Sequence, residues 1–277
     1  MNVVKANGEI VPFDADRIRR SLIRVKAKPK IIEQVIEAVK GEIYDGIPTS
    51  ELYRFVFKKL KKLQRDVAGK YNLKKALMEL GPTGFPFEKF IAAVWQAEGF
   101  RVKTGQIVKG ACVSHEVDVV AEKGDLCEFV ECKHHSFRGN VCSVKNTLYF
   151  NARFLDLEKK QLAKSAKSPK KYKGWLVTNI RFTSEAIAYG TCVGLGLLSW
   201  DFPPKRGLRE RIDKAGLHPI TCLTSLSNKQ KKQLMDKEIT LCRDLGIKPE
   251  VLSQIGIRGE KAKQVLEEAS AIHGMSF

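Results

Sequence analysis

The sequence predicts an α/β protein of three segments: a hairpin with a small helical bundle, a mixed sheet covered by helices, and a helical C-terminal region. Three observations predict this class. An Asn-Gly dipeptide lies between short β-prone runs near the start, apolar runs alternate with helical patterns in the middle, and apolar residues recur at helical spacing towards the end. The predicted segments are residues 1–80, 81–215 and 216–277.

Composition narrows the class of partner. The chain has 277 residues, a hydrophobic content of 43% and a formal net charge of +18. This hydrophobic content excludes an intrinsically disordered chain, and the positive charge favours a polyanion such as nucleic acid. The seven cysteines are odd in number and include no Cys-x-x-Cys pair, so neither a disulfide framework nor a structural zinc site is expected.

Targeting signals are not expected either. The sequence has no run of about eighteen apolar residues, and its start lacks the apolar stretch of a secretory signal. We therefore expect a cytoplasmic protein with no membrane partner.

The first segment begins with a predicted hairpin. Residues 3–13 place valine, isoleucine and phenylalanine on both sides of Asn7-Gly8, which is a strong signal for a tight turn between strands. Asp14 or Asp16 then caps a first helix, and a second helix follows over residues 31–39.

The rest of the first segment is predicted to be a turn and a further helix. Gly46-Ile47-Pro48 indicates the turn, and Thr49-Ser50-Glu51 indicates the cap of a helix that continues through Leu60. Residues 81–84, Gly-Pro-Thr-Gly, predict a linker or sharp turn into the second segment.

Two stretches of the first segment, VVKANGEIVPFDADRIRRSL and IYDGIPTSELYRFVFKKL, resemble the ATP-cone, a module that binds adenine nucleotides. The resemblance implies that ATP or dATP is an effector. No P-loop motif occurs in the chain, so hydrolysis of the nucleotide is not required. The alternative is a degenerate cone that only packs or dimerises, since Ala6 stands where the family usually has a second basic residue. The positions that the resemblance implies for nucleotide binding are Val3, Lys5, Gly8, Asp14, Arg17 and Thr49.

The second segment predicts a helix followed by strands and further helices, hence a mixed sheet. The helix begins near Phe85 and ends at Gly99. The predicted strands begin at Phe100 and at Gly174 and include residues 117–121, 128–133 and 196–200.

Three charged residues of this sheet form a candidate catalytic group. Glu131 and Lys133 are two apart on one strand and so share a face, and a tight turn makes Asp118 their cross-strand neighbour. Asp118, Glu131 and the Cys132 carbonyl offer hard oxygen ligands for Mg²⁺ or Mn²⁺, and Lys133 can orient water and offset charge. Glu88, on the preceding helix, adds a further candidate carboxylate. The alternative is that these residues are solvent-facing charges of an edge strand.

The blocks FPFEKFIAAVWQAEGFRV, HEVDVVAEKG, FVECKHH and GWLVTNIRFTSEAIAYG resemble Mrr-type restriction endonuclease domains of the PD-(D/E)xK superfamily. The resemblance covers about residues 82–200. It implies a restriction-endonuclease-like fold in which Asp118, Glu131 and Lys133 are catalytic. Val117 departs from the proline of the superfamily name.

Two further features are candidate DNA contacts. Seven lysines in residues 159–173 predict either a phosphate-contacting loop or a solvated one; the candidates are Lys159, Lys160, Lys164, Lys170 and Lys171. The Ile-Gly-Ile-Arg-Gly pattern at residues 255–259 resembles a helix-hairpin-helix, with Gly256 and Arg258 towards DNA. A plain helical hairpin that packs on the sheet is the alternative there.

The sequence thus favours a Mg²⁺-dependent endodeoxyribonuclease with an adenine-nucleotide-binding domain, in DNA restriction or repair. Paired strand cuts by such an enzyme favour a homodimer. The alternative function is an ATP-responsive DNA-binding regulator without catalytic activity.

Overall fold

The computed structural model describes residues 1–277 apart from 6, 82–83, 138, 165–169 and 275–277. Its helices and mixed sheets confirm the α/β class. The chain divides into two compact units. Unit 1 comprises Met1–Ala76 and His218–Phe277, and unit 2 comprises Leu77–Leu217. The third predicted segment therefore joins the first one in unit 1, whereas the sequence left it either free or packed on the sheet.

Unit 1 begins with the predicted hairpin. Strands β1 (Asn2–Val4) and β2 (Ile10–Pro12) pair antiparallel, and Gly8 in the connecting turn has a φ of +83°. A third strand, β3 (Ile47–Pro48), pairs parallel with β1. The prediction of a turn at residues 46–48 is thus wrong in part, because Ile47 is buried and pairs with Val3.

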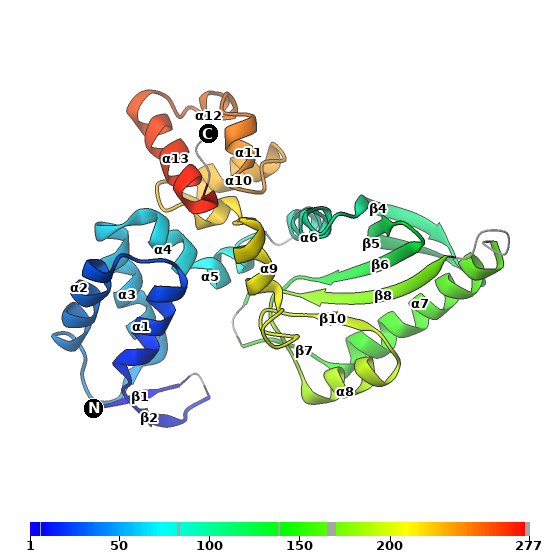
Figure 1. The fold of residues 1–277 in the computed structure, drawn as a ribbon, viewed down its shortest axis with the longest axis horizontal. Coiled ribbons are helices and arrows are strands. Elements are labelled where there is room, and N and C mark those ends of the chain that lie inside the picture. The colour runs from blue at the N-terminus through cyan, green and yellow to red at the C-terminus, as the bar shows by residue number, and fades with distance from the viewer. Residues whose placement is uncertain (6, 82–83, 138, 165–169, 275–277) are drawn as a thin grey trace. The chain divides into compact units, whose positions relative to one another are not determined.

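A small helical bundle follows the hairpin (Figure 1). Asp14 caps the first helix, accepting a hydrogen bond from the Asp16 N–H at 2.8 Å. Thr49 was expected to cap the third helix, but the N-cap is Pro48, so Thr49 is the first helical residue. The helices are α1 (Ala15–Arg24), α2 (Pro29–Lys40), α3 (Thr49–Leu63), α4 (Arg65–Tyr71) and α5 (Leu73–Met78).

The C-terminal part of unit 1 packs on α4. A Cβ atom added to Gly69 would lie 2.7 Å from Ile272 Cδ1 and 2.8 Å from the Cys222 carbonyl oxygen, so only glycine fits this approach. The elements here are η1 (Ile220–Cys222), α10 (Asn228–Asp236), α11 (Asp244–Ile247), α12 (Val251–Gln254) and α13 (Gly259–His273).

Unit 2 contains a five-stranded sheet of order β10-β8-β6-β5-β4. Strand β5 pairs antiparallel with both β4 and β6, whereas β8 lies parallel to both β6 and β10. The strands are β4 (Arg101–Lys109), β5 (Ser114–Lys123), β6 (Leu126–Lys133), β8 (Lys171–Thr178) and β10 (Gly196–Leu198). A separate parallel pair joins β7 (Val141–Cys142) to β9 (Arg181–Phe182).

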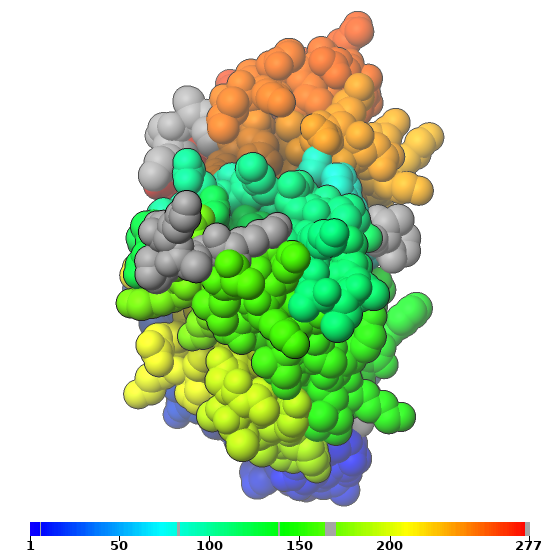
Figure 2. Space-filling view, turned by 90° about the vertical axis from the view of Figure 1, so that its right-hand side faces the viewer, coloured from blue at the N-terminus to red at the C-terminus, as the bar shows by residue number. Residues whose placement is uncertain are grey.

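Helices lie on both faces of this sheet (Figure 1). They are α6 (Phe85–Ala97), α7 (Val144–Lys164), α8 (Ser184–Cys192) and α9 (Leu208–Ala215). On the α7 side, Phe129, Phe154 and Leu176 belong to one apolar core. On the α6 side, Trp95 meets Trp175 edge to face. The surface that β4, β5 and α7 contribute faces the viewer in green in Figure 2.

Two predictions outside the core can be compared with this fold. The lysine run begins on a helix and not on a loop, because α7 continues to Lys164. Among the residues that the structure describes, no helix has both the length and the apolar character that a membrane span requires.

Candidate functional site

The sheet of unit 2 brings the three predicted catalytic side chains to one place. Strands β5 and β6 are paired up to Val119 and Val130, so Asp118 and Glu131 stand next to each other just beyond that pair. Glu131 and Lys133 share a face of β6, and the Lys133 Nζ atom donates a hydrogen bond to Glu131 Oε1 at 2.6 Å.

Arg153 belongs to the same group, although no sequence signal marked it. From α7, its Nη1 atom donates to Glu131 Oε2 at 2.5 Å, and its Nη2 atom donates to the Glu116 carbonyl oxygen. Both carboxylate oxygens of Glu131, a residue only 4% exposed, are therefore held by cations. Such pairing offsets the cost of burying this carboxylate.

Asp118 carries an unfavourable charge. Burial and the nearby Glu131 raise its pKa to about 6, even though its Oδ2 atom accepts a hydrogen bond from the Cys132 N–H at 2.6 Å. Burial, Asp118 and two further carboxylates likewise raise the pKa of Glu88 to about 7. Burial is the largest cause of both shifts, and the neighbouring carboxylates add to it.

The end of β6 is fixed by residues of β8 and the segment that follows it. Thr178 Oγ1 donates to the Lys133 carbonyl oxygen at 2.7 Å. The Asn179 amide accepts from the His135 N–H at 2.9 Å and donates to the His135 carbonyl oxygen at 2.8 Å. Thr178 and Asn179 are both buried, so they orient the chain that carries Lys133. They occur in the block GWLVTNIRF, which marked the strand but not this role.

The charge state of Lys133 follows from its neighbours. Burial of the ammonium lowers its pKa, but the hydrogen bond to Glu131 and the charges of Glu131 and Asp118 outweigh burial and raise the pKa overall. Lys133 is therefore protonated at neutral pH and supplies a fixed positive charge.

The donor set only partly fits Mg²⁺ as it stands. Asp118, Glu88 and the Cys132 carbonyl offer oxygen atoms, and a bound cation would offset the burial and the mutual repulsion that raise the pKa values of the two acids. Glu131, however, has both oxygens bound to Lys133 and Arg153. In the described part of the chain, no three His, Cys, Asp or Glu side chains form a ready metal-binding group. A bound metal would therefore require Glu131 to exchange a partner.

The predicted lysine contacts lie away from this group. Lys171 pairs in register with Leu126, at the opposite end of β6 from Lys133, about seven residues or 23 Å along the strand. Lys170 and Lys171 form ion pairs there with Glu122 at 2.8 Å and Asp125 at 3.5 Å. Proximity in sequence had suggested DNA contacts beside the sheet, but these two cations are neutralised locally.

The remaining lysines lie on α7. Lys159 is exposed and Lys160 is half-buried, while the Lys164 side chain and residues 165–169 lie outside the described residues.

The other predicted DNA contact lies in unit 1. Gly256 and Arg258 are exposed in the turn between α12 and α13, and Gly256 has a φ of +79°. Because α12 is a single turn, this region only partly matches a pair of helices joined by a hairpin.

Unit 1 has a pocket of about 270 Å³ that gathers four of the six predicted nucleotide-binding residues: Val3, Asp14, Arg17 and Thr49. The pocket is also lined by Phe13, Ser21, Tyr53 and Tyr71, which the sequence reading did not select. Its size is close to the lower end of the range for ligand sites, about 300–1,000 Å³.

Aromatic rings form part of the pocket wall. Tyr53 and Tyr71 stack with their centroids 4.9 Å apart, and burial raises the pKa of Tyr71 to about 12. A stacked, neutral aromatic wall suits a flat ring such as a nucleobase.

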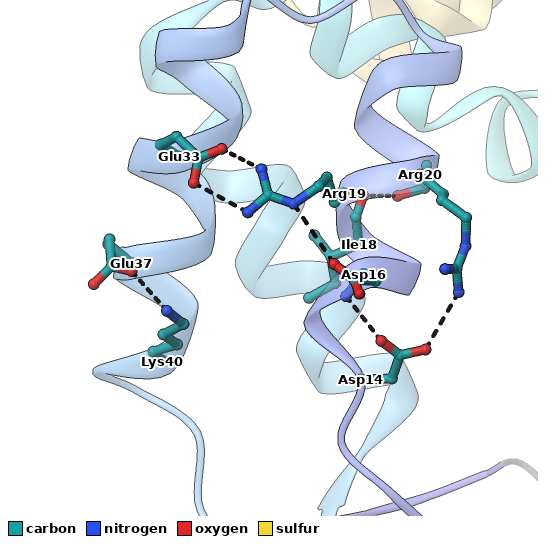
Figure 3. Close-up of polar contacts among 9 residues, drawn as sticks. Asp14, Asp16, Ile18, Arg19, Arg20, Glu33, Glu37 and Lys40 are labelled. Atoms are coloured by element: carbon teal, nitrogen blue, oxygen red, sulfur yellow. Dashed lines mark hydrogen bonds and ion pairs between the residues drawn. The ribbon is translucent and has the colours of Figure 1, made fainter.

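The other two predicted residues, Lys5 and Gly8, do not line this pocket. Lys5 pairs with Glu9 at 3.1 Å across the β1–β2 turn, which contains Gly8. Arg17 is exposed and lies 3.5 Å from Asp14. Figure 3 shows Asp14 at the start of α1, where it also binds Arg20 at 3.2 Å, and Arg19 reaching Glu33 on α2. These pairs fix the first turn of α1 beside the pocket.

Comparison with known proteins gives two family matches. The ATP cone domain family matches residues 1–77, which confirms the first resemblance. The family described as AF1548-like, C-terminal, matches residues 218–273.

Two whole-protein similarities extend further. An uncharacterized protein of Archaeoglobus fulgidus is 35% identical over 185 residues, which is 66% of this chain and 100% of that protein. The solved structure entitled crystal structure of protein of unknown function AF1548 is 34% identical, with a TM-score of 0.55. The match covers 69% of this chain and 98% of that one.

Proposed function

We propose that this chain, which belongs to the AF1548-like family and begins with an ATP-cone domain, is an adenine-nucleotide-responsive, metal-dependent endodeoxyribonuclease of the Mrr-like, PD-(D/E)xK type. The observation that carries this proposal is the convergence of Asp118, Glu131 and Lys133 on the neighbouring interior strands β5 and β6, with Glu88 close by. The strand order and the mixed pairing in unit 2 support it.

The chain's own residues have distinct roles in this chemistry. Asp118, Glu88 and the Cys132 carbonyl would hold Mg²⁺ or Mn²⁺, joined by Glu131 once it releases a cation. When bound, the metal lowers the pKa of its water and offsets phosphate charge. Lys133 donates hydrogen bonds to a phosphate oxygen and stabilises the charge that grows in the transition state.

The proton balance is simple. The oxygen of a water molecule attacks phosphorus, the bond from phosphorus to the leaving oxygen breaks, and the water proton passes to solvent. Glu88 does not take this proton, because in this proposal its carboxylate holds the metal. The leaving oxygen takes up a proton from solvent. Lys133 keeps the phosphate oriented throughout.

Regulation is assigned to unit 1. In this proposal, the pocket around Arg17 and the stacked tyrosines binds ATP or dATP, and the bound nucleotide changes the rate of cleavage without being hydrolysed. The exposed Arg17 guanidinium is the cation of the pocket that can pair with phosphate oxygens.

One observation favours a second candidate function. Glu131 is already neutralised by Lys133 and Arg153, which would suit a protein that binds DNA without cutting it. The second candidate is therefore an ATP-responsive DNA-binding regulator with no catalytic activity.

The test is cleavage of supercoiled plasmid with Mg²⁺ or EDTA, with and without ATP. We expect nicking that requires Mg²⁺. The nicking rate should fall about 100-fold or more in Asp118→Ala, because the metal loses a ligand. Asp125→Ala is the matched control. Asp125 is exposed just before β6 begins, far from Lys133, so this variant should cleave the plasmid normally. Arg17→Ala should abolish the ATP effect alone, with exposed Lys30→Ala as its control.

The outcome that would contradict the nuclease is specific. It is DNA binding without cleavage on plasmid, methylated, single-stranded and branched DNA, with Asp118→Ala binding as well as the wild type. That result would establish the regulator instead.

A further inference from the structure

Unit 2 has a basic cavity of its own, between the end of α6 and α9. Its volume is about 590 Å³, within the range of about 300–1,000 Å³ found for ligand sites. Its charged lining comprises four cations and two carboxylates: Lys205, Arg206, Arg211, Lys214, Glu98 and Glu210. The excess of cations favours an anionic ligand.

Arg211 is held rigidly at this cavity. Its Nη1 atom donates to Glu98 Oε1 at 2.9 Å, and its guanidinium lies 5.7 Å from the Trp95 ring centroid and 5.5 Å from that of Trp175. An arginine fixed in this way binds an anion without first losing rotational freedom.

The other three cations are not neutralised. Lys205, Arg206 and Lys214 are exposed, and their side chains make no ion pair with any residue that the structure describes. Lys205 also has a φ of +62°, in the left-handed region that lysine rarely adopts.

Glu210 adds a negative charge to the wall of this cavity. Its Oε1 atom accepts from Arg209 Nε at 2.9 Å, whereas its Oε2 atom is buried and has no hydrogen-bond partner among the described residues. Because Oε2 is buried, a ligand in the cavity meets Glu210 as a nearby negative charge and not through this oxygen. Val94, Ala97 and Ala215 add an apolar wall.

We propose that this cavity binds a nucleoside phosphate. The cations take the phosphate, and the apolar wall covers the base or the sugar. A free nucleotide and the phosphorylated 5′ end of a DNA strand share this chemistry. The site is distinct from the catalytic carboxylates, because Ala97 is nine residues or about 14 Å along α6 from Glu88. It therefore does not depend on the proposed cleavage activity.

The test uses the full chain and three probes: AMP, inorganic phosphate, and a short oligonucleotide with or without a 5′ phosphate. Calorimetry should show that the triple variant Lys205→Ala, Arg206→Ala, Lys214→Ala binds AMP or the phosphorylated oligonucleotide about tenfold or more weakly. Photolabelling with an azido derivative of AMP should mark residues of α9 or the loop before it, in addition to any label on the cone.

A matched control removes the same charge elsewhere on unit 2. Lys103, Lys109 and Lys145 are exposed, and their triple alanine variant should bind every probe as the wild type does. Glu210→Gln should bind AMP and inorganic phosphate at this cavity more tightly, because it removes a negative charge beside the cations.

The outcomes are separable. Binding of the phosphorylated oligonucleotide without binding of AMP identifies the strand end as the source, and the reverse identifies a free nucleotide. The proposal is overturned if the pocket variant binds like the control, if the wild type binds no probe up to millimolar concentration, or if the label appears only in residues 1–77. The nucleoside part is overturned if inorganic phosphate blocks the label on α9 as effectively as AMP does.

Discussion

Glu88 shows how the site balances its charges. It lies in the first turn of α6, where a helix favours a carboxylate, yet its pKa is raised to about 7 by burial and then by Asp118, Glu116 and Glu131. Ionised Glu88 therefore opposes folding unless a cation is bound nearby.

This yields a prediction for stability in EDTA. The folded pKa of Glu88 is above the unfolded value of about 4.3, so its ionisation costs nothing at about pH 4 and the full amount above about pH 7. Glu88→Gln should therefore stabilise the protein against urea at about pH 8 and have little effect at about pH 4. Mg²⁺ should reduce the difference at the higher pH.

Exposed Glu260 provides the control, since Glu260→Gln should give the same small change at both pH values. A stabilisation by Glu88→Gln that is equal at both ends of the range would show that ionisation is not its cause.

Residue-level prediction succeeded where it depended on alternation along a strand. Glu131 and Lys133 are in contact because side chains two apart share a face. Arg153 could not be found in this way, since it reaches Glu131 only because α7 packs across the sheet. The same holds for Tyr53 and Tyr71, which come from separate helices and meet at the pocket of unit 1.

At the scale of elements, the contact between α4 and α13 is the tightest approach in unit 1 that depends on a glycine. Gly69→Ala should lower the free energy of unfolding by about 1–3 kcal/mol, because the new methyl group overlaps Ile272 and the Cys222 carbonyl. Urea denaturation would measure the change.

Gly41→Ala is the matched control. Gly41 ends α2 with a φ of −75°, and a Cβ there would lie no closer than 3.8 Å to any of its neighbours. It should be neutral or slightly stabilising. Equal effects of the two substitutions would show that the close approach at Gly69 is not maintained in solution.

Long elements could be predicted and short ones could not. The strands β5 and β6 have enough residues for an apolar pattern to emerge, whereas β3 and β9 have two residues each and no periodicity to detect. The lysine run was misread because lysine is frequent both in loops and on exposed helix faces, and its first residues lie on α7.

At the scale of the molecule, unit 1 is assembled from two distant parts of the chain. Removing residues after Leu217 should expose the surface of α4 around Gly69 and Lys70, and unit 1 should lose its protection against hydrogen exchange. Unit 2 should keep its protection, because its sheet and helices lie within Leu77–Leu217. Unchanged protection in residues 1–76 would show that the cone is stable alone.

This division could not be read from the sequence. Local patterns placed segment boundaries close to residues 76 and 217, but nothing local shows which segments pack together. The contact between Gly69 and Ile272 joins residues about two hundred positions apart, and its complementarity exists only in three dimensions.

The split composition of unit 1 also orders events during synthesis. The residues of α4 leave the ribosome long before those of α13, and all of unit 2 is translated between them. The sheet with the carboxylate cluster can therefore fold while the ATP-cone domain still lacks its packing partner. The nascent chain would complete the proposed catalytic group before unit 1 is fully packed. Any regulation of cleavage by unit 1 would therefore begin only after α13 has been translated.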